Sequence, residues 1–509
     1  MKTVLLFTDF STASDHTVKY GYQLAKRISA YVVLCQAFMI PLAVPKPRPI
    51  CKVIGLAVGL LFSSGLITTA YCQDMAIRNQ LNKQSQHLYY PLSVKRFYSA
   101  MNFRTAWLAP DTVKTHTYDA MLLLDCVRQY GLNHADYYPD KLLYDKLNAI
   151  TTNYALSNPD ERASFDIFLT DAMIRFVNNL HYGKLNPRYT EKLLDARSND
   201  GLRAENVLLS AIKTNNFVGD IERVQPRSEL YRNLQRQMHQ MAGVYVGDCY
   251  DVPEASLRQV AVNMERLRWI PVKGRTYIQI NIPSFTLRFR QQDTDVSYRV
   301  VVGKRETPTT IASGTLTNII LGDPIPDTRR WLPSSLNDIN YVEKHAYQLT
   351  DLDGRRIEPT AANIAIAKQN PSKYRLIVPK PGQNTANLIN FELSDAPNII
   401  LAGRANGRSF KTTNLALSIG NIGVEQAGKL AASLLKYDSG RGNSIELDQA
   451  IITKQRRNYQ LKSPLPVYVT YQTCEVKEGM LETYDDIYHL DERVSKALFK
   501  GAITVPAYQ

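Results

Sequence analysis

The sequence is poor in the residues from which metal and redox centres are built. It contains only six cysteines, eight histidines and three tryptophans in 509 residues. No two cysteines form a C-x-x-C pair and no histidines form an H-E-x-x-H motif, so we expect no metal site, no thioredoxin-like centre and no cofactor. The sequence leaves open whether Cys126, Cys249 or Cys474 form disulfides.

Acidic residues are outnumbered, with 47 Asp and Glu against 61 Lys and Arg, and the formal net charge is +14. This excess favours polyanionic surroundings such as a membrane face, a wall polymer or nucleic acid. No zinc-finger spacing and no aromatic-plus-basic RNA motif accompanies it, so we expect no nucleic-acid partner. The length allows two or three domains with hydrophobic cores of their own.

One long uncharged hydrophobic run, residues 53–71, follows the basic residues Lys46, Arg48 and Lys52. Basic residues before such a run predict that the remainder of the chain is exported. Residues 70–72, Ala-Tyr-Cys, form an acceptable cleavage site, yet the run is also just long enough to span a membrane. We therefore expect residues 46–74 to be a signal peptide or a signal anchor, which places the protein in the periplasm or cell envelope and allows contact with the inner membrane through residues 53–71.

The residues before this run read as strand, helix and strand, the helix at residues 17–29. Residues 1–11 resemble the start of a universal stress protein, and the resemblance, which covers residues 1–45, implies that Asp9 contacts a nucleotide. The glycine-rich phosphate loop of that family is missing downstream. Met39 provides a conventional start for the export signal, so we also hypothesise that residues 1–38 are a fusion remnant or an overextended reading frame.

Residues 75–250 read as a helical domain. Asn158 and Pro159 predict the start of a long helix, whose apolar residues from Phe165 to Leu180 recur at helical spacing as one stripe. The amino-acid sequences of residues 97–107, 130–137 and 168–188 resemble the helical scaffold domain of the larger L,D-transpeptidases (YkuD type), the cysteine enzymes that cross-link peptidoglycan. Few residues separate Met241 from the next helix, so the peptidoglycan-binding module that this family usually inserts there is expected to be absent.

A connecting helix is expected within residues 251–275, and from Tyr277 the hydrophobic period changes towards two, as in half-buried strands. The resemblance implies that residues 276–500 form an L,D-transpeptidase-like β-domain, with Tyr374–Val378 among its strands and a helical lid at about 335–372. The expected fold class is therefore α+β, a helical scaffold domain followed by a β-rich domain with a lid insertion.

Residues 397–424 resemble the signature of the same family, which runs strand, His, a loop with Phe, then Ser-Gly-Cys-Ile/Val-Arg and a helix. Phe410, Ser418 and Gly420 stand where the signature has them. Ala402 takes the His position at the end of the expected strand. Asn421 takes the Cys position, at the N-terminus of the expected helix, where it can act as a cap. Gly423 takes the Arg position.

The leading hypothesis is an exported family member that has lost its chemistry, because the vestigial positions Ala402, Ser418, Gly420, Asn421 and Gly423 keep the frame without nucleophile, base or Arg. Its expected partners are peptidoglycan stem peptides or wall-synthesis proteins. One alternative is an active L,D-transpeptidase whose nucleophile has moved to Ser418 or Cys474, with His345 or His489 near the cleft. The other is a nucleotide-binding stress protein.

Overall fold

The computed structural model describes residues 3–8, 31–36, 75–109, 115–196, 201–242, 254–270, 272–292, 294–321, 348–351, 355–370, 373–377, 389–396, 399–403, 410–439, 444–453 and 457–499. The chain divides into two units, residues 1–67 and 68–509. In the first unit, strands β1 (Thr3–Thr8) and β2 (Tyr31–Gln36) pair in parallel, which confirms the two expected strands. The helix expected at residues 17–29, together with Asp9, Met39 and the apolar run 53–71, lies outside the described residues. None of the described helices is long and apolar enough to cross a membrane.

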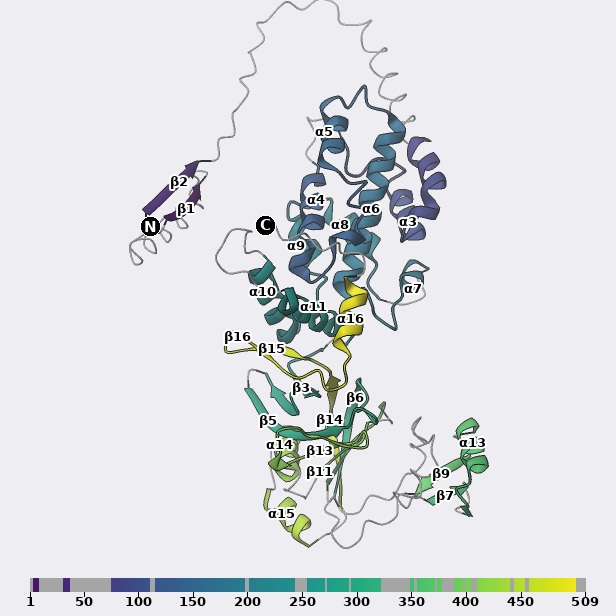
Figure 1. The fold of residues 1–509 in the computed structure, drawn as a ribbon, viewed down its shortest axis with the longest axis vertical. Coiled ribbons are helices and arrows are strands. Elements are labelled where there is room, and N and C mark those ends of the chain that lie inside the picture. The colour runs from purple at the N-terminus through teal and green to yellow at the C-terminus, as the bar shows by residue number, and fades with distance from the viewer. Residues whose placement is uncertain are drawn as a thin grey trace, which may run out of the picture. The chain divides into compact units, whose positions relative to one another are not determined.

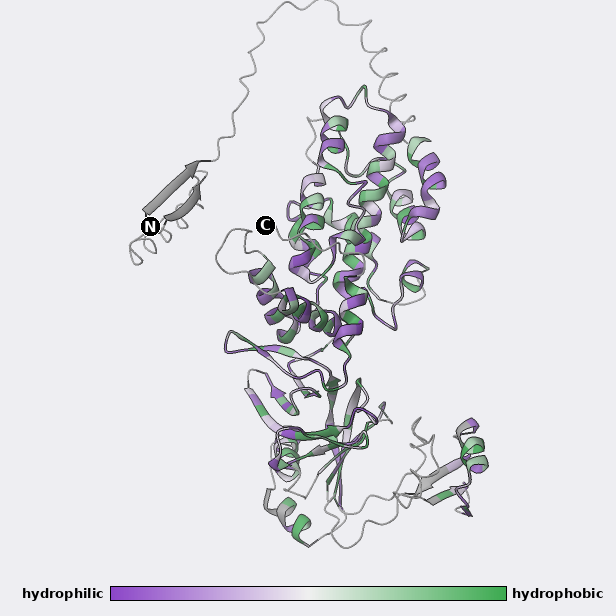
Figure 2. Ribbon diagram, in the orientation of Figure 1, coloured by the Kyte–Doolittle hydropathy of each residue, from purple (hydrophilic) through white to green (hydrophobic). Residues whose placement is uncertain are grey.

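The second unit begins with the helical part of the chain (Figure 1). Its helices include η1 (Ser85–His87), α3 (Pro91–Ala100), α4 (Thr117–Asp125), η2 (Val127–Tyr130), η3 (His134–Asp136), α5 (Tyr144–Thr152), α6 (Pro159–Tyr182), α7 (Glu191–Asp195), α8 (Ala204–Ala211), α9 (Phe217–Glu222), α10 (Glu229–Ala242) and α11 (Glu254–Trp269). Green apolar residues lie mainly where these helices face one another (Figure 2). They form one continuous buried core from Ala76 to Val224.

Helix α6 is the centre of this core. It begins as predicted, with Asn158 accepting a hydrogen bond from the Asp160 amide at 2.9 Å and Pro159 in the first turn. The apolar stripe predicted for this helix is confirmed, and the polar positions of α6 are buried as well, so that the helix is enclosed on nearly all sides. Its buried carboxylates hold neighbouring loops instead: Asp166 accepts hydrogen bonds from the amides of residues 106–108 at 2.8–3.0 Å, and Asp171 accepts from those of residues 89 and 90.

The β-rich part contains a nine-stranded sheet in the order β12-β5-β13-β11-β10-β6-β14-β3-β4, and β4 also pairs with β5, which closes the sheet into a barrel. Its strands are β3 (Thr276–Asn281), β4 (Thr286–Gln291), β5 (Thr294–Gly303), β6 (Ala312–Leu321), β10 (Ile389–Leu393), β11 (Leu401–Gly403), β12 (Ala416–Ser418), β13 (Ile422–Val424) and β14 (Arg457–Thr470). The α+β fold class is thereby confirmed. Helices α14 (Ala427–Ser439) and α15 (Ser444–Ile452) follow β13, and the hairpin β15 (Cys474–Lys477) and β16 (Met480–Thr483) precedes α16 (Asp491–Leu498).

A separate three-stranded sheet, in the order β8-β7-β9, occupies much of the expected lid. It consists of β7 (Gln348–Asp351), β8 (Arg356–Ile357) and β9 (Tyr374–Ile377), and helix α13 (Ala361–Gln369) lies between β8 and β9 in the chain. The strand expected at Tyr374–Val378 is present as β9, but it pairs with β7 in this small sheet and not with the strands of the nine-stranded sheet. The insertion is therefore mixed rather than purely helical.

Helix α11 makes polar contacts with both the helical and the β-rich part. Arg268 donates hydrogen bonds to the Tyr130 carbonyl at 2.6 Å and to the Tyr231 hydroxyl at 2.8 Å, and it pairs with the fully buried Glu265. One turn earlier, Asn263 exchanges hydrogen bonds with Thr473 next to β15, at 2.8 and 2.9 Å. Side chains of one helix thus bind residues from distant parts of the chain.

Candidate functional site

The motif residues lie on the strands at the centre of the barrel sheet. Strand β11 pairs in parallel with β13, and Ala402 is the direct partner of Gly423. On its other side β11 is antiparallel to β10, where Asn390 is the partner of Ala402, and Gly423 is in turn opposite Val301 of β5. Directly paired residues point to the same face of a sheet. Asn390, Ala402, Gly423 and Val301 therefore form one row across four strands.

The neighbouring row shows which face this is. Phe391, Leu401 and Ile422 are paired with one another, and all three are buried in the main hydrophobic core of the β-rich part. Side chains alternate between the two faces along a strand, so the row through Ala402 lies on the face away from that core. Val301 in this row packs instead against Phe410 in a separate small cluster. The retained Phe of the motif therefore belongs to the candidate site's face.

The turn before β13 is fixed by its own hydrogen bonds. The Ser418 hydroxyl donates to the Asn421 carbonyl at 2.5 Å and accepts from the Gly420 amide at 3.2 Å. Gly420 has φ 104°, a left-handed conformation that favours glycine. Ser418 and Gly420 thus shape the turn that carries Asn421. The Ser418 hydroxyl is committed to this turn, and none of its hydrogen bonds in the described structure involves a base.

A second set of contacts holds this turn from outside. Thr309 accepts a hydrogen bond from the Gly303 amide at 2.8 Å and donates to the Gly420 carbonyl at 3.0 Å. Tyr488 accepts from the Thr309 amide at 3.1 Å and donates to the Gly303 carbonyl at 2.8 Å. A side chain at Gly303 would lie 2.2 Å from the carbonyl oxygen of Thr307, so the close approach requires glycine. These contacts, which we call the Thr309 clamp, fix the motif turn through residues far away in sequence.

Two carboxamide atoms beside the row remain without a hydrogen-bond partner in the described structure. They are Nδ2 of Asn390, a donor, and Oδ1 of Asn421, an acceptor, and both atoms are buried. Asn421 ends the turn that Ser418 holds, directly before β13. Buried polar atoms are normally paired, so each of these two unpartnered atoms requires an explanation, and a bound ligand group is one that can be tested. Asn390 escaped the sequence analysis because only strand register brings it beside Ala402.

Two details of the motif differ from expectation. Ala402 lies in the middle of β11, which runs one residue beyond it, and does not follow a strand end. Asn421 does not cap the following helix, because strand β13 intervenes and α14 begins only at Ala427. The helix's apolar face is as expected, with Leu430, Ala431 and Leu434 fully buried.

Cys474 does not lie among these residues in the described structure. Its thiol accepts a hydrogen bond from Asn263 Nδ2 at 3.2 Å, and its neighbours in the core cluster come mainly from α10 and α11. Burial raises the pKa of this thiol well above its ordinary value, which disfavours the thiolate needed for attack. Cys126 and Cys474 are both free. Cys249 and His345 lie outside the described residues, and no described hydrogen bond joins the His489 side chain to the motif.

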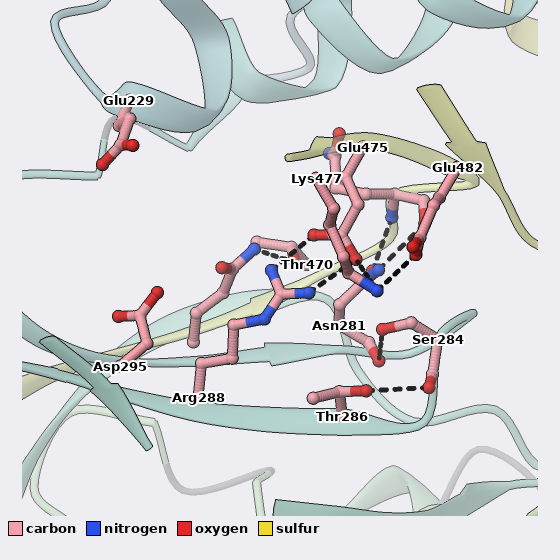
Figure 3. Close-up of polar contacts among 12 residues, drawn as sticks. Glu229, Asn281, Ser284, Thr286, Arg288, Asp295, Thr470, Glu475, Lys477 and Glu482 are labelled. Atoms are coloured by element: carbon pink, nitrogen blue, oxygen red, sulfur yellow. Dashed lines mark hydrogen bonds and ion pairs between the residues drawn. The ribbon is translucent and has the colours of Figure 1, made fainter. Parts of the chain in front are cut away.

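Acidic and basic side chains are concentrated elsewhere, around the β15–β16 hairpin (Figure 3). Arg288 of β4 forms a bidentate pair with Glu475, and Tyr484 donates to the same carboxylate. Lys477 bridges Glu475 and Glu482. Burial acts to raise the pKa of the Glu475 carboxyl, but the hydrogen bonds and charge of Arg288 outweigh it and lower that pKa. Arg288 and Lys477 pair with Glu475 and Glu482, so each of these charges has a partner of opposite sign. The cluster therefore attaches the hairpin to β4 of the sheet. No group of three described His, Cys, Asp or Glu side chains could hold a metal ion.

Comparison with known proteins agrees with this architecture. A family model described as the scaffold domain matches residues 92–238. A putative L,D-transpeptidase of Haemophilus influenzae is 26% identical over 349 residues, which cover 65% of this chain and 68% of that protein. The scaffold-domain match and the similarity to this relative together support an L,D-transpeptidase family member of the type with a scaffold domain.

Proposed function

We propose that the protein is an exported L,D-transpeptidase homologue that binds peptidoglycan stem peptides and does not turn them over. The observation that carries this proposal is the pairing of Ala402 with Gly423 across β11 and β13, with Asn421 in the turn just before β13. By the resemblance, these three positions are the ones where the family signature has His, Cys and Arg. Loss of one residue could leave a rewired mechanism. Loss of three within a maintained frame removes the chemistry.

The motif lacks a nucleophile that could attack a stem peptide. Attack on the amide of a stem peptide by this family's route needs a thiolate, generated by a neighbouring base. The Asn421 carboxamide has no group that ionises at neutral pH, and Ala402 offers no base. The Ser418 hydroxyl is weakly nucleophilic without a base and is already hydrogen-bonded within the turn. The buried, protonated thiol of Cys474 is no better candidate.

Binding without turnover is supported by the two unpartnered carboxamides. Asn390 Nδ2 can donate to a peptide carbonyl, and Asn421 Oδ1 can accept from a peptide N–H. Each buried polar atom without a partner costs about 1–3 kcal/mol, which a bound peptide group would recover. Phe410 and Val301 add an apolar surface beside them. A wall-synthesis protein that presents such a peptide segment is the second partner class that this site accommodates.

The experiment is a titration of the purified chain with diaminopimelate-containing stem peptides, followed by mass spectrometry of the products after long incubation. The proposal expects binding and an unchanged peptide population. Cross-linked or trimmed products would show that the site, or a relocated nucleophile, is active. If the stem peptides do not bind, the proposed binding function is wrong. Export is tested separately by N-terminal sequencing of the protein recovered from the native cell envelope; a cytosolic chain that begins at Met1 would contradict it.

A further inference from the structure

A pocket of about 360 Å³ lies away from the motif, where five segments meet. Its walls come from the loop after α6, the end of α11, the residue before β6, the residues around the end of β14, and helix α16 with the residue before it. The lining is predominantly apolar and includes Leu185, Trp269, Ile311 and Val494. Apolar pockets of this size with a few convergent polar groups are typical of sites for small organic ligands.

Two residues of the lining have unmet hydrogen-bonding capacity. Nη2 of Arg266 and Oε1 of Gln472 are buried and have no hydrogen-bond partner in the described structure. The two residues are 6% and 3% exposed, so these side chains belong to the pocket wall and not to the surface. The Gln472 carboxamide can present either its oxygen or its amino group, because the two differ only by a rotation. The pocket therefore has two polar anchors in an apolar wall.

The charge of the lining selects among ligands. It contains two guanidinium groups, Arg266 and the exposed Arg493, and no acidic residue among those that the structure describes. Asp491 lies behind Arg266, accepts from its Nη1 at 2.5 Å and also accepts from the Thr473 hydroxyl at 2.6 Å. Asp491 thus orients the guanidinium and offsets one of the two positive charges. A net positive charge remains at the pocket, which favours an anion with an apolar body.

We propose that this pocket binds a small carboxylate with an apolar chain, whose carboxylate receives hydrogen bonds from Arg266 and Gln472 while its chain lies against Trp269 and Ile311. Arginine is suited to this role because its planar guanidinium can bind a carboxylate while a second nitrogen keeps its own partner. Arg493 adds attraction for the same anion. The proposal does not depend on the function of the motif site, which none of these residues forms.

The test uses the full-length chain and octanoate as the probe, with titration calorimetry as the readout. Octan-1-ol and octylamine have the same chain with a neutral and a cationic head. We expect octanoate to bind about tenfold more tightly than octan-1-ol, because a charge-assisted pair is lost with the alcohol, and octylamine to bind no more tightly than the alcohol. Equal affinity for octanoate and octan-1-ol, or no octanoate binding at millimolar concentration, would overturn the proposal.

Variants locate the site. Ile311→Trp fills the pocket at a side chain that is 40% exposed, and Gln472→Glu places a negative charge beside the carboxylate. Both should lower octanoate affinity about tenfold or more. Ile452→Trp, at an exposed position of α15 that does not line the pocket, is the matched control and should bind as the parent does. Circular dichroism checks that each variant is folded. If a folded Ile311→Trp binds octanoate as tightly as Ile452→Trp, the proposed site is wrong.

Discussion

Ala402 and Gly423 face each other directly across the parallel strands β11 and β13, and both positions have the smallest of side chains. In the L,D-transpeptidase signature that residues 397–424 resemble, the position of Ala402 is a His, which is a base, and the position of Gly423 is an Arg, which is a cation. The backbone pairing that brings them together is intact, and the turn before Gly423 is held by Ser418 and the Thr309 clamp. The pairing of β11 and β13 is therefore present without the base and the cation of the family signature. The polar side chains beside this pair include the carboxamides of Asn390 and Asn421.

The side-chain carboxamides of Asn390 and Asn421 should contribute to the affinity for stem peptides and not to the stability of the fold. Asn421→Ala and Asn390→Ala each remove a buried polar atom whose unmet hydrogen bond costs about 1–3 kcal/mol, so the free energy of unfolding should stay the same or rise by up to that amount. Each should weaken stem-peptide binding about tenfold. Chemical denaturation and peptide titration on the same samples provide both values. Ser418→Ala is the contrasting variant, since it breaks two hydrogen bonds of the turn and should reduce stability. A large stability loss in both Asn variants with unchanged peptide affinity would assign them a structural role.

Gly303 should tolerate no side chain. A methyl group there would lie 2.2 Å from the Thr307 carbonyl oxygen and 2.7 Å from the Thr309 amide nitrogen, so Gly303→Ala must displace the Thr309 clamp. We expect a loss of roughly 2 kcal/mol or more in unfolding free energy. Gly428→Ala in α14 is the control, because its methyl group would meet only Ile451 at 3.5 Å and alanine favours the helix. Equal stability of the two variants, measured by urea unfolding, would show that the clamp is not rigid.

The Arg288–Glu475 pair should make stability depend on pH in the acid range. The pKa of Glu475 is lowered in the folded chain, so its contribution is present above the unfolded value of about 4.3 and is lost as the pH falls through the lower folded value. Glu475→Gln leaves the Arg288 charge partly buried and should cost about 3 kcal/mol near neutral pH. The difference in unfolding free energy between Glu475→Gln and the parent should be smaller at about pH 3 than near neutral pH. Urea unfolding at both pH values measures it, and a difference that grows on acidification would contradict the assignment.

Breaking the buried pair of Glu265 and Arg268 should reduce the unfolding free energy more than breaking the pair of Arg288 and Glu475. Both side chains are fully buried, so Glu265→Leu leaves the Arg268 guanidinium without its carboxylate and should destabilise the chain by about 3–5 kcal/mol. Replacing both, as Glu265→Leu with Arg268→Met, should restore much of that loss. Arg258→Ala removes an exposed pair with Glu254 and should change stability by less than about 1 kcal/mol. Thermal unfolding of the three variants is the measurement. If the double variant is no more stable than Glu265→Leu, the loss arises from packing or from the hydrogen bonds that Leu185 and Trp269 donate to Glu265, and not from the Arg268 charge.

Local patterns predicted much of this fold. The start of α6 at Asn158 and Pro159, the strands from Tyr277 onward and the apolar face of α14 are set by residues adjacent in sequence or one turn apart. The all-round burial of α6 escaped prediction, because its polar positions, such as Asp166, are satisfied by loop amides distant in the chain. Periodicity alone cannot reveal such partners.

The candidate site divides in the same way. The positions of Ala402, Asn421 and Gly423 follow from the order of the motif, and the structure places them on one strand pair and its turn. Asn390 and Thr309 could not be found by that means, since only the pairing of β10 with β11 and the hydrogen bonds of the Thr309 clamp bring them there. Long-range register is a property of the folded barrel and leaves no local signal in sequence.

Whether the motif lacks a working nucleophile can be measured by intact-protein mass spectrometry after incubation with a carbapenem, which acylates the nucleophile of this family. We expect the native chain to keep its mass, because neither Asn421 nor Ser418 forms an acyl adduct and Cys474 is buried and protonated. The triple variant Ala402→His, Asn421→Cys and Gly423→Arg returns nucleophile, base and cation to the same strands and serves as the comparison. A stoichiometric adduct on the native chain would show that the protein has a working nucleophile and that the proposed loss of chemistry is wrong.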